Sequence, residues 1–386
     1  MTNRTVLAIA YALATILALP AMAQNIRIAQ FNASMSRGEA NALLAALDGG
    51  TDPQITQVAE IITLVSPDIL LINEFDYDPA APALFLANYL AEAGYTYYYI
   101  APSNTGLASG VDINADGHVA TAPGRIEYAN DAFGFGFFPG QFGMLVLSRH
   151  EILTDRVRRF QTFRWADMPD ARLPMNENGT PYYGPEAINI FRLSSKSHWD
   201  VPIRVGDQVI HLLASHPTPP VFDGPEDRNG TRNADEIRFW ADYVQGAAYI
   251  QDDAGATGSL TKGAHFIVAG DLNADPFDGD SFPGAARQLL DLPLINTSLT
   301  PGSRGGLAAA LAQGQANDSH QGNPTFDTAD FGDEAPGNLR VDYVLPSATL
   351  GLTDAGVFWP APGEEGADLI SASDHRLVWI DVTLPR

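Results

Sequence analysis

Short apolar runs that end on a polar residue recur along this chain of 386 residues. Residues 26–32 alternate between apolar and polar positions, which predicts a strand, and residues 68–74 form a nearly continuous apolar run ending on the carboxylate of Glu74. A continuous run is typical of strands in a sheet whose faces are both covered. Further strands are expected at residues 95–100, 144–147, 209–214, 265–269, 340–345 and 377–382.

Helical periodicity separates several of these runs. Apolar residues recur at helical spacing over residues 54–65, and Pro67 ends the pattern. Two further helices are expected at residues 83–93 and 232–250, the second with Asn233 as its N-cap. This order of strands and helices predicts an α/β protein in which residues 24–386 form two packed halves of one domain.

Turn-forming residues dominate three long segments, which are predicted to be loops: residues 102–143, 169–183 and 300–333. The first contains Asp112, Asn114 and Asp116 in the spacing of the first half of a calcium loop. Pro123 stands where the closing glutamate of an EF-hand would be, so the alternatives are an Asx-rich turn and a Ca²⁺ site completed by other residues.

The N-terminus has the features of a secretory signal peptide. Arg4 is followed by an apolar stretch over residues 6–19 and by the small-x-small sequence of residues 21–23. The stretch is short for a membrane anchor and ends at Pro20, which favours cleavage before Gln24 and a periplasmic or extracellular location. No later segment is apolar enough to be a transmembrane anchor.

Composition narrows the chemistry. The chain has no cysteine, which excludes disulfides, thiolate metal sites and thiol nucleophiles. The formal net charge of -24 disfavours binding to nucleic acid through nonspecific attraction, although local basic patches remain compatible with it. The sequence leaves the oligomeric state open.

Polar side chains capable of metal or proton chemistry follow several of the expected strands. An acidic residue in such a place more often forms a turn or caps a helix, so each position alone carries little weight. Together they match the strand-end placement of sites in α/β sheets. The positions are Asn32, Glu74, His216, Asp271, Asn273, Asp342, Asp374 and His375.

Oxygen ligands of this kind suit hard divalent cations. Glu74, Asp374 and the amide oxygen of Asn32 fit Mg²⁺ or Mn²⁺, with Ca²⁺ as a third candidate. A histidine oriented by a carboxylate can transfer protons near neutral pH, and His375 with Asp342 is the expected pair. These residue types therefore predict metal-assisted hydrolysis of a phosphoester.

The motifs resemble those of the endonuclease/exonuclease/phosphatase family, which includes DNase I-like nucleases. The resemblance spans nearly the whole chain after residue 24, and GDLN followed by SDH is its most specific part. It implies a four-layer α/β/β/α sandwich, in which two packed mixed sheets are flanked by helices. The matching segments are QFN at 30–32, INE at 72–74, GMLVLSR at 143–149, ASH at 214–216, GDLNADP at 270–276, VDYVL at 341–345 and SDH at 373–375.

The resemblance also implies a role for each residue. Glu74 would be the principal metal ligand, with help from Asn32 and Asp374. Asp271 would orient or deprotonate the attacking water, and the other catalytic groups would bind the phosphate or transfer protons. In this scheme Asn273 holds a phosphoryl oxygen, His216 binds the phosphate, and Asp342 orients His375 as the acid/base or phosphate ligand; Arg149 is either a further basic site residue or a solvated charge.

Two departures from nuclease-type members bear on the substrate. Residues 217–220 form a rigid Pro-Thr-Pro-Pro segment after His216, and the loop of residues 102–140 is larger than a minimal nuclease requires. A phosphodiesterase or phosphatase is therefore the first hypothesis, an extracellular nuclease the second and a phospholipid head-group hydrolase the third. The alternative of another class is a secreted binding module without catalytic activity. His198 and Trp199 are expected to pack in the core rather than border the site.

Overall fold

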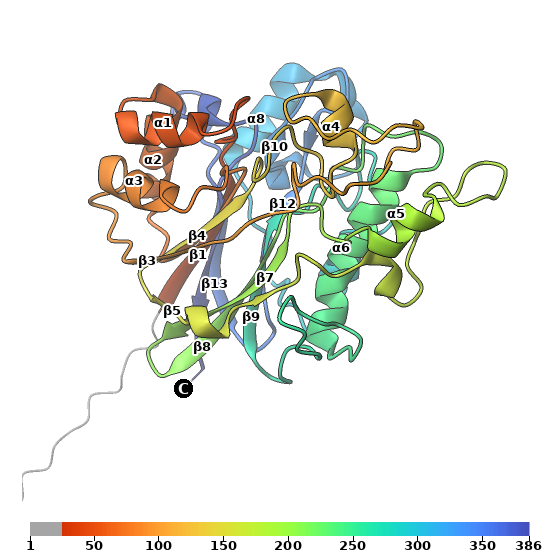
Figure 1. The fold of residues 1–386 in the computed structure, drawn as a ribbon. Coiled ribbons are helices and arrows are strands. Elements are labelled where there is room, and N and C mark those ends of the chain that lie inside the picture. The colour runs from red at the N-terminus through yellow and green to blue at the C-terminus, as the bar shows by residue number, and fades with distance from the viewer. Residues whose placement is uncertain (1–24, 386) are drawn as a thin grey trace, which may run out of the picture.

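Two six-stranded sheets pack face to face in the computed structural model, which describes residues 25–385 (Figure 1). Helices cover the outer face of each sheet, so the fold is the expected four-layer sandwich. The proposed signal peptide of residues 1–23 lies outside the described residues. Between residues 25 and 385, the structure contains no helix with the length and apolar character needed to cross a membrane.

The first sheet has the strand order β13-β14-β1-β2-β4-β3. Strand β1 is parallel to β2 and antiparallel to β14, and β4 runs antiparallel to both of its neighbours. The strands are β1 (Asn25–Asn32), β2 (Ile69–Asn73), β3 (Tyr97–Ile100), β4 (Met144–Ser148), β13 (Gly351–Val357) and β14 (Val378–Thr383).

The second sheet has the order β12-β9-β8-β7-β5, with β6 also paired to β7. Strands β8 and β9 are parallel, and the other pairs are antiparallel. The strands are β5 (Glu151–Ile152), β6 (Arg158–Arg159), β7 (His198–Val205), β8 (Gln208–Ser215), β9 (His265–Asp271) and β12 (Asp342–Pro346). A separate two-stranded sheet joins β10 (Ala329–Asp330) to β11 (Asn338–Leu339).

Three apolar layers hold the sandwich together. The inner faces of both sheets form one of them, where Ile28 and Leu71 share a cluster with Val201 and Leu212. The outer layers lie under the helices of each half. On the first sheet these are α1 (Ala42–Gly49), α2 (Pro53–Val65) and α3 (Ala81–Asn88); on the second they are α5 (Pro185–Ile190), α6 (Arg228–Gln245) and α7 (Arg287–Leu290).

Helix α2 shows how the sequence specifies these elements. Asp52 caps it by accepting hydrogen bonds from the backbone N–H groups of Gln54 and Ile55, and Pro53 occupies its first turn. Ile55, Val58 and Ile62 are buried on its inner face, as the periodicity predicts. Fully burying each such side chain contributes about 1.5–3 kcal/mol.

Several expectations required correction. Helix α6 begins at Arg228, so Asn233 lies inside the helix rather than at its N-cap. Its buried amide donates to the carbonyl oxygens of Thr218 and Leu272 at 2.8 Å, which holds two loops in place. The segment of residues 300–333 contains α8 (Arg304–Gln313) and two 3-10 turns, η3 (Gln315–Ser319) and η4 (Pro324–Phe326), although its composition predicts a loop.

Other short elements also fall within predicted loops or between predicted elements. They are α4 (Ile126–Asn130) and the 3-10 turns η1 (Thr154–Arg156), η2 (Trp165–Asp167) and η5 (Ile370–Ala372). His198 and Trp199 begin β7 and are buried, as expected for packed residues. The His198 ring bonds the hydroxyl of Ser194 at 2.6 Å and the carbonyl oxygen of Glu236 at 2.9 Å.

Candidate active site

The strand register brings the candidate residues to one edge of the sandwich. In the parallel pair β1 and β2, Asn32 lies opposite Asn73, so Glu74 follows at the same level. In the other sheet, Asp271 at the end of β9 lies opposite Asp342 at the start of β12. His216 follows β8, which runs parallel to β9, so His216 reaches the same edge.

Two amide side chains connect the sheets beneath this edge. The Asn73 side-chain oxygen accepts hydrogen bonds from the Asp271 backbone N–H at 3.0 Å and from Gln30 Nε2 at 2.8 Å. Gln30 Nε2 also donates to Asp342 Oδ1 at 3.0 Å. Buried hydrogen bonds of this kind fix the relative position of the sheets, because each one left unmade costs about 1–3 kcal/mol.

Asp271 is the centre of the group. Its Oδ2 accepts from Asn32 Nδ2 at 3.0 Å and lies 3.4 Å from His216 Nε2, while Oδ1 accepts from the Asn273 backbone N–H at 2.9 Å. Burial raises the pKa of Asp271, but nearby His375 and the hydrogen bonds from His216 and Asn32 outweigh burial and lower it below its ordinary value. Asp271 is therefore an anion at neutral pH.

Glu74 stands beside Asp271 through a shared partner. Asn32 Nδ2 donates to Glu74 Oε1 at 3.2 Å as well as to Asp271. Glu74 has the left-handed φ of 59°, which an L-residue adopts at a cost in strain, so its side chain is aimed by the local backbone. Burial raises the pKa of Glu74, and His375 and Asn32 oppose this shift.

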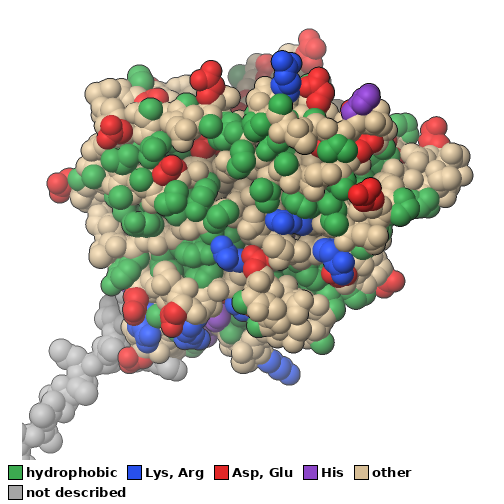
Figure 2. Space-filling view, in the orientation of Figure 1, with side chains coloured by type: hydrophobic (Ala, Val, Ile, Leu, Met, Phe, Trp, Pro, Cys, Tyr) green, Lys and Arg blue, Asp and Glu red, His purple; other side chains and the backbone are tan. Residues whose placement is uncertain are grey.

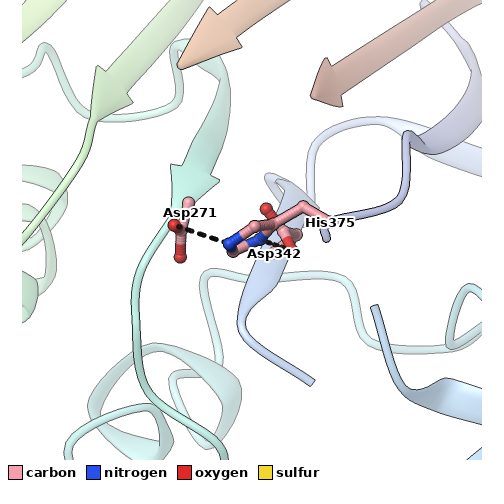
Figure 3. Close-up of side chains that lie close together, drawn as sticks. All are labelled: Asp271, Asp342 and His375. Atoms are coloured by element: carbon pink, nitrogen blue, oxygen red, sulfur yellow. Dashed lines mark hydrogen bonds and ion pairs between the residues drawn. The ribbon is translucent and has the colours of Figure 1, made fainter. Parts of the chain in front are cut away.

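His375 lies between two carboxylates that come from neighbouring strands (Figure 3). Its Nδ1 is 2.8 Å from Asp342 Oδ2, and its Nε2 is 3.7 Å from Asp271 Oδ2. Thr328 Oγ1 donates to the same Asp342 oxygen at 2.9 Å. Burial lowers the pKa of His375, but the two carboxylates outweigh burial and raise it to about 10.

His216 and Lys196 complete the polar surroundings. Burial and the charge of Lys196 lower the pKa of His216 to about 4, so this imidazole is neutral at pH 7. Lys196 is itself buried, and its Nζ donates to the carbonyl oxygen of Pro217 at 3.3 Å. Burial lowers the pKa of Lys196, while Glu236, Asp271 and Glu74 oppose that shift by their charge.

Sequence reasoning missed Gln30, Asn73, Thr328 and Lys196 as parts of the site. Gln30 and Asn73 stand inside the motifs QFN and INE, but a motif does not reveal which neighbour supports which. Lys196 is one of two lysines in the chain, in a Ser-rich stretch before β7. A lysine in so acidic a chain, just before a strand, was the available signal.

The remaining predicted residues lie near the edge or away from it. Asp374 is exposed, and its Oδ1 accepts from Ser34 Oγ at 3.1 Å rather than joining the bonds around Asp271. The Asn273 side chain donates to the Pro217 carbonyl at 3.1 Å. Arg149 lies at the opposite end of the sheet, where it pairs with Asp68 at 3.2 Å, so it is a structural charge.

The acidic turn in the long loop has its own backbone partners. Asp112 accepts from the N–H groups of Asp116 and Gly117, and Asp116 accepts from the N–H of His118. All of these bonds are exposed to solvent. This is the geometry of an Asx-rich turn. Calcium binding at Asp112, Asn114 and Asp116 stays a prediction.

Carboxylates and two histidines thus gather at one edge of a paired-sheet sandwich, where α/β folds place their functional sites. The endonuclease/exonuclease/phosphatase family profile matches residues 29–375. The chain therefore belongs to this family, whose members generally hydrolyse phosphoester bonds.

One solved structure supports the fold. An endonuclease/exonuclease/phosphatase from Beutenbergia cavernae DSM 12333 is 16% identical, with a TM-score of 0.51, over 93% of this chain and 72% of that one. A family protein from Leptotrichia buccalis C-1013-b is 15% identical (TM-score 0.47; 92% and 98% covered). Sphingomyelinase C from Streptomyces griseocarneus is also 15% identical (TM-score 0.47; 93% and 99% covered). A comparison with curated protein sequences gave no significant match.

Proposed function

We propose that this protein is an exported, divalent-metal-dependent phosphoester hydrolase that acts on a small or exposed phosphoester. One observation carries the proposal: Asp271 is held as an anion between Asn32, His216 and His375, with Glu74 at its side. A carboxylate with several fixed partners, next to a second carboxylate and a paired histidine, is suited to activating water.

The donor chemistry at this edge fits a hard cation. Glu74 and Asp271 share one amide donor, and Glu74 forms no salt bridge with any residue from 25 to 385. Glu74 would hold Mg²⁺ or Mn²⁺, with Asp374 at the exposed rim as a further ligand. Asn32 would join them only with its amide turned over, since its Nδ2 faces Glu74 and its oxygen accepts from the Ser34 N–H. When bound, such a cation polarises a phosphoryl oxygen and lowers the pKa of nearby water.

Side chains of the protein would orient the water, transfer protons and bind the phosphoryl oxygens. Asp271 would orient the attacking water, because its ionised carboxylate accepts hydrogen bonds. His375 holds a proton through Asp342 and would donate to a phosphoryl or leaving oxygen. His216 is neutral and would contribute a hydrogen bond rather than a charge, with Asn273 beside it at the same edge.

Lys196 would supply a second buried positive charge beside that of protonated His375. Its ammonium and the Asn273 amide both donate to the Pro217 carbonyl, which brings the two donors together. Glu236 on α6 fixes this arrangement by accepting from the backbone N–H groups of Ser195 and Thr218 at 2.6 and 2.7 Å. A cation so placed would stabilise negative charge on phosphoryl oxygens.

The charge distribution favours a small substrate over nucleic acid. The net charge is -24, and on the face drawn in Figure 2 basic side chains stand singly or in small groups among acidic ones. Polyanion binding usually relies on a continuous basic surface. An extracellular nuclease is therefore the second candidate, since the family includes nucleases by name.

A substrate and metal panel tests the proposal. Protein lacking residues 1–23 would be assayed on bis-p-nitrophenyl phosphate, p-nitrophenyl phosphate and plasmid DNA, each with Mg²⁺, Mn²⁺ or EDTA. We expect metal-dependent turnover of a small ester that EDTA abolishes. Cleavage of plasmid alone would favour the nuclease, and no turnover of any ester would favour a binding module.

Glu74→Gln provides the matched metal test. The substitution keeps the size of the side chain but removes its anionic oxygen, so the metal concentration needed for half-maximal turnover should rise by at least about tenfold. Unchanged metal titration would remove Glu74 as a ligand. Export is tested separately, by N-terminal sequencing of the secreted protein, which should begin at Gln24.

A further inference from the structure

Two further carboxylates, Asp278 and Asp327, line a cavity that we name the Asp327 cavity. It has a volume of about 70 Å³, more than the roughly 10–15 Å³ that one water molecule requires. Its walls come from the loop after β9 and from the segment that contains α8, η3 and η4. The lining residues are Asp278, Ala310, Asn317, His320, Gly322, Pro324 and Asp327.

Asp327 is the unusual member of this group. Its side chain lines the cavity, only 6% of the residue is exposed, and it accepts no hydrogen bond from residues 25–385. Buried carboxylates in folded proteins are normally paired or hydrogen-bonded, because an isolated one is costly. Burial, together with the charges of Asp275 and Asp278, raises the pKa of Asp327 to about 8.

The neighbouring carboxylates are held differently. Asp275 accepts three backbone N–H bonds, from Phe277, Asp278 and Arg340, and so needs no further partner. Asp278 accepts one bond on each oxygen, from the N–H groups of Gln321 and Gly322 at 2.8 Å. Each of its oxygens keeps a second lone pair for another ligand.

The carboxylates of Asp275, Asp278 and Asp327 also lack a compensating positive charge. None of these three carboxylates forms a salt bridge with a lysine, arginine or histidine in the part of the chain that the structure describes. His320 lines the cavity, but its Nε2 is 2.8 Å from the Pro336 carbonyl. A partly enclosed polar space with uncompensated carboxylates is a favourable place for a cation.

We propose that the Asp327 cavity binds one divalent cation of the calcium class, with carboxylate oxygens of Asp327 and Asp278 as its anionic ligands. Calcium accepts six to eight oxygen ligands in irregular arrangements, so water and wall oxygens would complete a site with two carboxylates. The site is distinct from the edge that carries Glu74 and Asp271. It joins two loops that are far apart in the sequence, near residues 278 and 327.

The cation would stabilise a segment that supports the active site. Asp327 directly precedes Thr328, whose hydroxyl donates to the Asp342 oxygen that also contacts His375. Fixing Asp327 therefore fixes the backbone from which Thr328 extends. The expected primary consequence is greater thermal stability, which is measurable without any substrate.

The experiment separates this site from the active site by using the Glu74→Gln background. Calcium would be added to metal-free protein, and binding followed by calorimetry and by the melting temperature. At free calcium about 100 times Kd, we expect a rise of about 3–4 °C. The double variant Glu74→Gln/Asp327→Asn should lose this rise and bind calcium at least about 100-fold more weakly. The control Glu74→Gln/Asp280→Asn changes an exposed carboxylate nearby, and it should keep the rise in melting temperature and the calcium affinity.

Folding of the variant has its own check. Without metal, the contribution of Asp327 to the stability of the protein falls as the pH rises from about 4 toward 8, because the folded state holds the Asp327 proton more tightly than the unfolded state does. Metal-free Asp327→Asn should thus melt no lower than wild type above pH 8. The proposal is overturned if millimolar calcium leaves the Glu74→Gln protein unchanged, if the Asp327→Asn variant retains the full response, or if zinc or manganese binds there in preference to calcium.

Discussion

Asp271→Asn is the substitution that most directly tests the arrangement of the site. The carboxylate receives hydrogen bonds from Asn32 Nδ2 and the Asn273 N–H, and His216 Nε2 lies 3.4 Å away. An asparagine keeps one acceptor oxygen but presents an amide NH₂ group on the other side. Whichever way the amide turns, a donor faces a donor, because every partner around Asp271 donates.

The magnitude follows from the bonds that are lost. Hydrogen bonds to a charged group are worth about 1.5–3 kcal/mol each, so two of them amount to about 3–6 kcal/mol. If these bonds keep the carboxylate in position in the transition state, their loss should lower turnover by about two to four orders of magnitude. The loss of stability should stay near 1–3 kcal/mol, since removing a buried charge offsets part of the cost.

The assay is kcat/KM on the best small phosphoester, with thermal unfolding measured in parallel. Asp280→Asn is the matched control, since it makes the same chemical change at an exposed position beyond β9 and should leave turnover unchanged. Near-wild-type turnover in Asp271→Asn would refute the assignment. So would a fall in activity that matched the fraction of protein unfolded at the assay temperature.

Two other changes probe the charges around Asp271. The folded state holds the proton of His375 up to a pKa of about 10, so this residue contributes stability that is complete below about pH 6.5 and is lost as the pH rises to about 10. His375→Gln should abolish this pH dependence of the melting temperature and lower turnover by about two to four orders of magnitude. If the difference in melting temperature between the variant and wild type does not vary with pH, the raised pKa of His375 is contradicted. Lys196→Gln should weaken inhibition by inorganic phosphate by about tenfold to 100-fold, whereas Lys262→Gln, at the other lysine, should not. Equal effects of the two lysine changes would show that Lys196 acts only through net charge.

The local pattern of the sequence was sufficient for most of the strands and for the residue types that gather at the candidate site. The expected strand at 265–269 corresponds to β9 (His265–Asp271), and the expected helix at 54–65 corresponds to α2. Such elements are readable because their periodicity comes from local geometry and from which face is buried. Helix α8 escaped prediction although it is rich in alanine and leucine. Of these residues only Ala310 is buried, so no apolar face marked the helix in the sequence.

The supporting residues could not be inferred in this way. Gln30 and Asp342 are 312 residues apart in the chain, yet Gln30 Nε2 lies 3.0 Å from the Asp342 carboxylate. Arg149 shows the converse. Its motif left open whether it belongs to the site, and the antiparallel register of β4 places it at the far end of the sheet. Strand register and sheet packing depend on the whole chain, so neither contact is encoded by nearby residues.

By itself, the sequence determined which chemical groups were available and that strand ends would present them: carboxylates and histidines, no thiols, and an acidic chain. Only the tertiary structure decided which groups meet and in what charge state. Burial and proximity shift the pKa of His375 upward and that of His216 downward, although both are histidines that follow or precede strands. The physical reason is that an ionisable group responds to its dielectric surroundings and to charges within a few ångströms, and these neighbours are assembled only when the two sheets pack.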